Sequence, residues 1–156
     1  MRTLVRSVGR SDIGGEPLPS CFKTFDNNKI IFRRAEVSML AGVPGVGKST
    51  LALALALRMH VPTLYISADT NAHTMAMRLA SMISGKNQTD VEHLMNTDTG
   101  WTKAVLNRAS HIVWSFESSP TLQDILEEVE AFEELWGVPP EAIFVDNLME
   151  IGRAHV

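Results

Sequence analysis

Residues 41–50, AGVPGVGKST, decide how the rest of the sequence is interpreted. From residue 42 to residue 49 they match the spacing G-x-x-x-x-G-K-[ST] without a gap. Glycines at these positions let the backbone wrap closely around a polyphosphate with its N–H groups pointing inward, a geometry that Cβ atoms would obstruct. The pattern therefore predicts a loop that binds the phosphates of a nucleotide.

Specific roles follow for the residues of this loop. Lys48 would reach the β- and γ-phosphates, and the hydroxyl of Ser49 would coordinate Mg²⁺. A helix that begins near Gly47 would add the positive end of its dipole beneath the phosphates. The alternative is a glycine-rich turn with a solvated lysine, which the intact pattern disfavours. The expected nucleotide contacts are Gly42, Val43, Pro44, Gly45, Val46, Gly47, Lys48, Ser49 and Thr50.

Strands and helices alternate along the chain around this loop. Strands are expected at residues 36–41, 63–69, 111–116 and 142–146. Helices are expected from near 47 to 60, at 71–85 and 121–137, with shorter ones around 91–95 and 101–108. This order predicts an α/β fold, a mostly parallel β-sheet with helices on both faces. The breakers in GGEPLPS predict a mobile arm at residues 1–20, followed by one domain at 21–156.

The helix expected at residues 121–137 is the most clearly amphipathic segment. Thr121 can cap its start and Gly137 can end it. Its glutamates are most simply a solvated face. The apolar residues that fall on one face are Leu122, Ile125, Leu126, Val129, Phe132, Leu135 and Trp136.

Nucleotide hydrolysis needs carboxylates in addition to a phosphate loop, and two are candidates. Asp146 follows a buried strand, so its carboxylate is expected beside the loop, where it would hold the metal. The alternative for Asp146 is a turn or cap residue. Asp69 ends another strand at the same edge and could act on the attacking water, but either Asp69 or Asn71 could instead cap the next helix.

Together these pieces resemble the RecA-like P-loop ATPases, and within them the ATPase domain of DnaB-type replicative helicases. EVSMLAGVPGVGKSTLALALAL resembles the strand, phosphate loop and first helix of that domain, and TLYISADTNAHTMAMRLASMISG resembles the strand and helix that carry its catalytic acid. The segment SSPTLQDILEEVEAFEELWGVPPEAIFVDNLMEI resembles its later helix and Walker B strand. The resemblance implies ATP and Mg²⁺ as cofactors, single-stranded DNA as a partner and a hexamer-like homo-oligomer. Lys48, Asp69 and Asp146 would be its catalytic residues, and Ser49 and Asp146 its metal ligands.

The chain also departs from the family. Asp69 stands where the family has Glu, and its carboxylate is one methylene nearer the backbone, so hydrolysis could be slow. A RecA-like domain continues beyond the Walker B strand with DNA-contacting loops, more strands and an arginine finger. Two interpretations of the end at Val156 are open. The chain is a truncated or split product, or the strand ending at Asp146 pairs directly with residues 36–41 in an abbreviated sheet.

Composition limits the function classes. Of the 156 residues, 45% are hydrophobic and 21% charged, which is ordinary for one globular domain. The formal net charge of −4 does not indicate a nucleic-acid binder, although a local basic patch is compatible with it. The single cysteine, Cys21, fits a reducing compartment, and no apolar run reaches the length of a membrane span. We therefore expect a cytoplasmic protein without a membrane partner.

Three functions remain open on the sequence alone. The first is an ATP-hydrolysing, helicase-type motor that acts in DNA replication or recombination. The second is a nucleotide-dependent assembly switch or helicase loader. The third is an inactive fragment that retains the phosphate loop.

Overall fold

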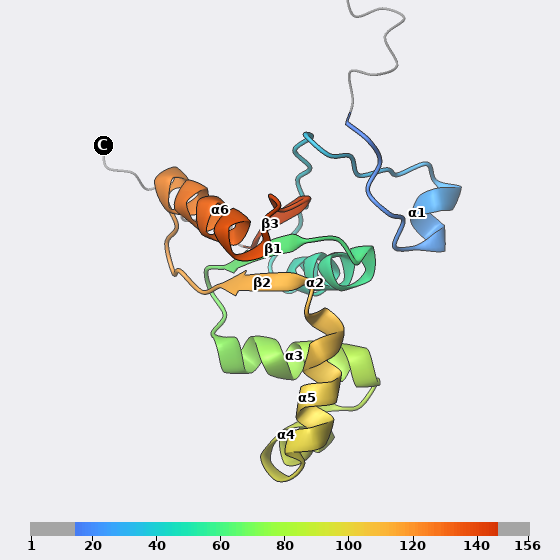
Figure 1. Ribbon diagram of the computed structural model, residues 1–156. Helices are drawn as coiled ribbons and strands as arrows, with labels where there is room; N and C mark the ends of the chain where they lie inside the picture. Colours follow the sequence, from blue (N-terminus) through green and yellow to red (C-terminus); the bar gives the residue numbers. More distant parts are fainter. Residues whose placement is uncertain (1–14, 147–156) are drawn as a thin grey trace, which may run out of the picture.

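The computed structural model describes residues 15–146 of the chain. Figure 1 shows that from α2 onward the strands are separated along the chain by one or more helices. The elements are α1 (Lys23–Asn27), α2 (Lys48–Met59), β1 (Thr63–Ser67), α3 (Ala72–Ser84), α4 (Gln88–Thr97), α5 (Thr99–Leu106), the 3₁₀ turn η2 (Asn107–Ala109), β2 (Ile112–Ser115), α6 (Leu122–Trp136) and β3 (Ala142–Asp146). The helix expected near residues 91–95 lies within the longer α4, and the one expected near 101–108 is formed by α5 together with η2.

The sheet of the described residues has three strands in the order β2-β1-β3. Both pairings are parallel: Thr63 on β1 lies opposite Ile112 on β2 and opposite Ala142 on β3. At the other end of the pairing, Ser67 lies opposite Asp146. Because all three strands run the same way, their carboxyl ends meet at one edge. The expected parallel α/β fold is confirmed.

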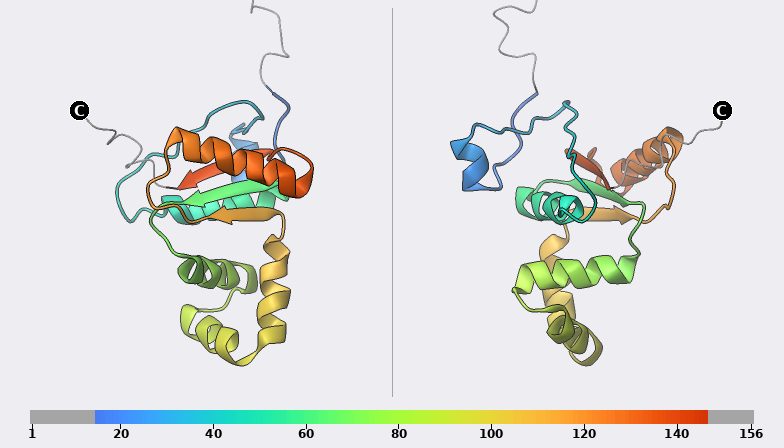
Figure 2. Two further views of the ribbon diagram at one scale, coloured as in Figure 1. Left: turned by 60° about the vertical axis from the view of Figure 1, so that its left-hand side comes forward. Right: turned by 180° about the vertical axis from the view of Figure 1, so that it is seen from behind.

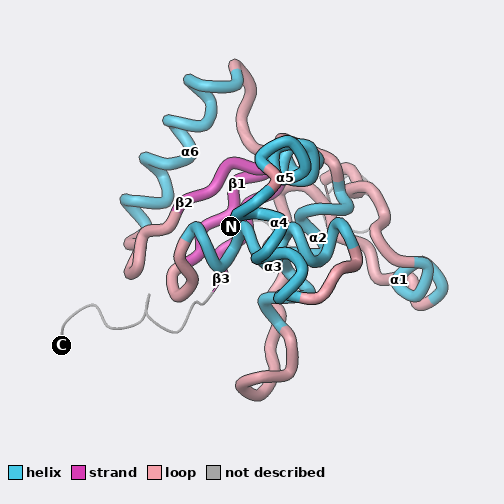
Figure 3. The backbone as a smooth tube through the Cα atoms, turned by 90° about the horizontal axis from the view of Figure 1, so that it is seen from below, coloured by secondary structure: helices cyan, strands magenta, loops and turns pink. Residues whose placement is uncertain are grey.

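The central strand β1 is buried along its whole length, and its side chains alternate between two helical layers. Tyr65 packs among residues of α2 and α3 on one face. Leu64 and Ile66 point to the other face, where they pack against Phe132 of α6. Figures 2 and 3 show α2 and α6 on opposite sides of the strands. Helices therefore cover both faces of the sheet, as the sequence predicts.

The three helices between β1 and β2 form an extension of the α2 side of the sheet. Ala80, Val91 and Val105 from α3, α4 and α5 make a buried cluster of their own. In Figure 1 these helices lie below the sheet. Among all the helices within residues 15–146, none is long and apolar enough to cross a membrane.

The segment before the phosphate loop packs against the far end of α2. Phe22, Phe25 and Phe32 lie against a cluster that contains Leu55 and Met59. Residues 15–20 are part of this layer, because Pro17 forms an antiparallel bridge with Arg33. The mobile arm expected at 1–20 stays a prediction, and residues 1–14 of it lie outside the described part. The domain boundary at residues 20 and 21 stays a prediction.

Residues 36–41 do not form the expected strand. Val37 is fully exposed and Met39 is 76% exposed, and the segment runs as a loop toward α2 (Figure 2). Strand β3 pairs with β1 and not with residues 36–41, so the interpretation of an abbreviated sheet is wrong for the described residues. An apolar run becomes a strand only when a neighbouring backbone supplies hydrogen bonds, and none of the described strands does so here.

The apolar face of α6 is wider than the surface it covers. Phe132 is buried and Ile125 and Val129 pack beside it, as expected. In contrast, three leucines and a tryptophan of the expected face are exposed, Leu122 at 69%, Leu126 at 50%, Leu135 at 72% and Trp136 at 37%. The prediction of one buried face is therefore half wrong, because the narrow sheet accommodates only the central stripe of the helix.

Candidate functional site

Glycines shape the loop between residues 42 and 47. Gly45 and Gly47 have φ angles of +79° and +97°, in the region that side-chain-bearing residues rarely adopt. A Cβ on Gly42 would lie 2.9 Å from Cγ1 of Val46, which is closer than real contacts allow. Backbone geometry therefore explains the glycines at 45 and 47, and the nearby side chain of Val46 disfavours a larger residue at 42. Glycines at these positions let a phosphate chain approach the loop backbone closely.

Helix α2 begins directly after this loop without a capping side chain. Its N-cap is Gly47, and no side chain accepts a hydrogen bond from the first backbone N–H groups. The first four N–H groups of any helix lack a partner within the helix and favour an anion. The start of α2 fits a phosphate group for this reason.

Lys48 is the first residue of α2, and its side chain turns back over the loop. Its Nζ donates hydrogen bonds to the carbonyl oxygens of Gly42 at 2.8 Å and Val43 at 3.1 Å. These bonds hold the ammonium group at the mouth of the loop. A cation in this place can pair with phosphate oxygens without a change in the backbone.

The structure brings together the two residues expected to hold a metal. Ser49 donates a hydrogen bond from its Oγ to Oδ1 of Asp146 at 2.9 Å, across 97 positions of sequence. A hydroxyl and a carboxylate are hard oxygen ligands of the kind Mg²⁺ prefers. Asp146 is held in turn by the register of β3, and its carbonyl oxygen accepts from the backbone N–H of Ala68 at 3.2 Å. The donor set therefore fits a magnesium ion bound with a nucleotide.

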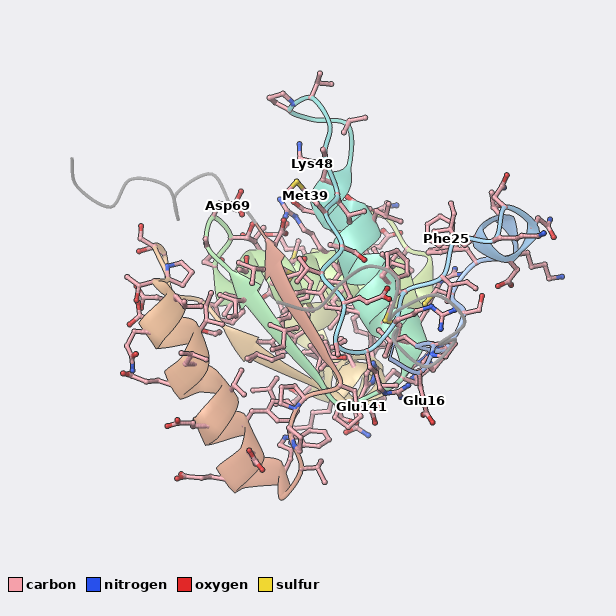
Figure 4. All side chains as sticks on the ribbon, turned by 90° about the horizontal axis from the view of Figure 1, so that it is seen from above. Glu16, Phe25, Met39, Lys48, Asp69 and Glu141 are labelled. Carbon is pink, nitrogen blue, oxygen red and sulfur yellow. The ribbon has the colours of Figure 1, made fainter. Side chains whose placement is uncertain are left out.

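Asp69 lies just beyond β1, toward the same end of the strands. Figure 4 shows Asp69 and Lys48 on this side of the molecule. The cap of α3 is Asn71, whose side chain accepts from the N–H of Thr74 at 2.9 Å, so Asp69 is free of the capping role. Asp69 accepts a hydrogen bond from Oγ1 of Thr70 at 3.1 Å and is exposed. Its expected action on water stays a prediction.

Comparison with known proteins assigns the chain to a family. Residues 17–153 match the family model described as "DnaB-like helicase C terminal domain". The chain belongs to the DnaB-like helicase C-terminal domain family. The glycine-containing loop at 42–47 and the elements β1, β3 and α6 all lie inside the matched range.

Two phage proteins are similar to this DnaB-like domain. The gene 65 protein of Mycobacterium phage L5 is 32% identical over 139 residues, which cover 88% of this chain and 52% of that protein. The gene 65 protein of Mycobacterium phage D29 is 33% identical over 110 residues, which cover 69% of this chain and 47% of that protein. The chain thus spans about half the length of the curated relatives it matches.

One residue of the candidate site was missed by sequence reasoning. Tyr65, in the centre of β1, donates a hydrogen bond from its hydroxyl to Oδ2 of Asp146 at 3.0 Å. Burial raises the pKa of Tyr65 far above its ordinary value, and the charges of Asp146 and then Asp69 raise it further. The available signal was a phenol in an otherwise apolar buried strand, because a buried hydroxyl requires a partner.

Proposed function

We propose that the chain binds ATP with Mg²⁺ and hydrolyses it, as the ATPase part of a DnaB-type helicase acting in DNA replication or recombination. The observation that carries this proposal is the hydrogen bond between Ser49 and Asp146. It places a hydroxyl at the start of α2 beside a strand-end carboxylate, next to a loop whose backbone can receive phosphates. A glycine-rich turn with a solvated lysine would not need that carboxylate.

Each proposed catalytic residue has a distinct task. Lys48 neutralises charge on the β- and γ-phosphates, and Ser49 and Asp146 hold Mg²⁺. Held by Ser49 and Asp146, the ion would supply positive charge that stabilises the terminal phosphoryl group during its transfer. Asp69 orients the attacking water and accepts its proton. Because Asp69 is one methylene shorter than glutamate, we expect slow turnover.

The experiment that tests nucleotide binding compares Lys48→Ala with Lys86→Ala, a lysine in the loop after α3. Calorimetric titration with MgATP should show an affinity about 10- to 100-fold lower for Lys48→Ala, since a charged hydrogen-bond donor to phosphate is lost. Lys86→Ala should bind like the unmodified protein. Equal affinity in the unmodified protein and Lys48→Ala would show that the loop assignment is wrong.

The wider activity is tested with single-stranded DNA. A helicase motor predicts that single-stranded DNA stimulates ATP hydrolysis and that the active form is a ring-like homo-oligomer.

The presence of Asp69 in place of glutamate favours a second candidate function, a nucleotide-dependent assembly switch or loader. The switch predicts MgATP binding with oligomerisation but with turnover that DNA does not change. The ATPase rate measured with and without single-stranded DNA therefore separates the two.

A further inference from the structure

Both oxygens of the Asp146 carboxylate are held by hydroxyl groups from different elements. Ser49 of α2 donates to Oδ1 at 2.9 Å, and Tyr65 of β1 donates to Oδ2 at 3.0 Å. The carboxylate is thereby held between helix α2 and the central strand β1. The first of these contacts belongs to the proposed metal site. The second has no part in the functions expected from the sequence.

Tyr65 itself is held rigidly. Its side chain is fully buried, and its ring stacks on Phe144 with centroids 5.6 Å apart and planes 13° apart. On the other side the ring of Trp114 lies 5.1 Å away. These aromatic residues occupy paired positions on β2, β1 and β3, so they form a row across one face of the sheet. The row fixes the direction in which the hydroxyl of Tyr65 points.

The strand register aims this hydroxyl at the carboxylate. Tyr65 lies opposite Phe144, and Asp146 follows two residues later on the same face of β3. Diagonal neighbours on one face of paired strands are within reach of long side chains. A phenylalanine at position 65 could fill the same space, so packing alone does not account for the phenol oxygen.

We propose that Tyr65 is a positioning residue for the Asp146 carboxylate: its hydroxyl holds one oxygen of Asp146 and so orients the group toward Ser49 and the metal ion. This inference rests on the proposed function, because it gives Asp146 the metal-binding role. Partners that orient a metal ligand typically contribute about 10- to 100-fold to metal affinity or activity. Tyr65 would then act through Asp146 without touching the nucleotide.

The first test removes the hydroxyl and keeps the ring. For Tyr65→Phe we expect the Mg²⁺ concentration that half-saturates nucleotide binding to rise about 10- to 100-fold. Binding of ATP in EDTA should stay unchanged. The matched control is Thr63→Val, which removes another buried hydroxyl of β1, one that donates to the carbonyl of Val61 at 2.8 Å. This control should alter stability and leave the Mg²⁺ dependence alone.

The second test leaves the chain intact. Tyr65 is the single tyrosine of the sequence, so ¹³C-labelled tyrosine gives one ring-Cζ signal by nuclear magnetic resonance. Adding Mg²⁺ to the protein with bound ATP should shift this signal, and the shift should vanish in Asp146→Asn. A Cζ signal that does not shift when Mg²⁺ is added would overturn the inference, and so would unchanged Mg²⁺ dependence in Tyr65→Phe. Either result would leave the proposed function standing as long as the unmodified protein binds MgATP. Absence of MgATP binding in the unmodified protein would overturn both.

Discussion

Helices α2 and α6 begin in opposite ways. At the start of α6, Thr121 and Asp124 form a capping box, in which each side chain accepts from the backbone N–H of the other residue. At the start of α2, Gly47 offers no side chain, and its backbone is left-handed. One helix closes its N-terminus with its own residues, and the other leaves it open.

The remaining longer helices resemble α6. A side-chain oxygen accepts from a backbone N–H at the start of each of them, from Asn71 in α3, Asn87 in α4 and Asp98 in α5. Such caps are worth about 1 kcal/mol each. The start of α2 lacks this stabilisation, and it lies where the sequence predicts a phosphate-binding site. The difference indicates that backbone donors at α2 are kept for a ligand, which the following substitutions can test.

Among the substitutions at helix starts, the largest effect is expected from Gly47→Ala. A left-handed backbone costs a residue with a Cβ about 1–2 kcal/mol, so the loop should relax away from the phosphate-binding shape. MgATP binding must then reverse this change, and we expect its affinity to fall about tenfold. Isothermal titration of the unmodified and substituted proteins measures the difference.

The control for this substitution is Gly85→Ala, at the C-terminal end of α3. Gly85 has a φ of +70° and open space around it, so the free-energy cost of alanine at this position should be similar. Gly85 is far in sequence from the loop at 42–47. It should lower the free energy of unfolding and leave MgATP affinity unchanged. If Gly47→Ala bound MgATP as tightly as Gly85→Ala does, the open start of α2 would have no role in binding.

A smaller and purely structural effect is expected from Thr121→Ala at α6. Its Oγ1 accepts from the N–H of Asp124 at 3.2 Å, and loss of such a cap costs about 1 kcal/mol of unfolding free energy. Urea unfolding measures the loss, and Thr97→Ala, a threonine in the last turn of α4, is the comparison. Reduced MgATP affinity in Thr121→Ala would contradict the claim that the capped start of α6 takes no part in nucleotide binding.

The comparison of β1 with residues 36–41 shows what sequence could predict of the fold. Both are short apolar runs next to a polar turn. Strand β1 is buried because β2 and β3 pair with it on either side, whereas Val37 and Met39 are exposed. Local composition predicts that a segment can form a strand, but the pairing backbone comes from elsewhere in the chain. The exposed leucines of α6 were missed for a similar reason. Helix periodicity predicts which residues share a face, but it does not give the width of the sheet that this face covers.

The candidate site was partly predictable for a related reason. Parallel strands place their carboxyl ends at one edge, so the position of Asp146 at that edge follows from element order. Its contact with Ser49 forms although residues 36–41, which precede the loop, make no strand. The contact between Tyr65 and Asp146 depends on the register of β1 against β3. A shift of one residue would turn Tyr65 to the α6 face, and no local pattern fixes that register.

The smallest expected effect concerns the pH dependence of the capping box. The backbone N–H and then the hydroxyl of Thr121 donate to Asp124, both at 2.7 Å to Oδ2, and these bonds hold the pKa of Asp124 below its ordinary value of 3.8. The charged form is thus favoured in the folded state. Its contribution to stability is fully present above the ordinary pKa and is lost as the pH falls through the folded-state pKa.

Asp124→Asn makes this contribution measurable against the unmodified protein. Urea unfolding at a series of pH values should show a constant difference in unfolding free energy near neutral pH. The difference should shrink once the pH falls below about 4, where the carboxylate of the unmodified protein takes up a proton. A difference that stayed constant down to the acid transition would mean that the cap does not depend on the charge of Asp124. MgATP affinity at neutral pH should be equal in both proteins. The N-terminus of α6 is capped by its own side chains and is not proposed to bind a ligand.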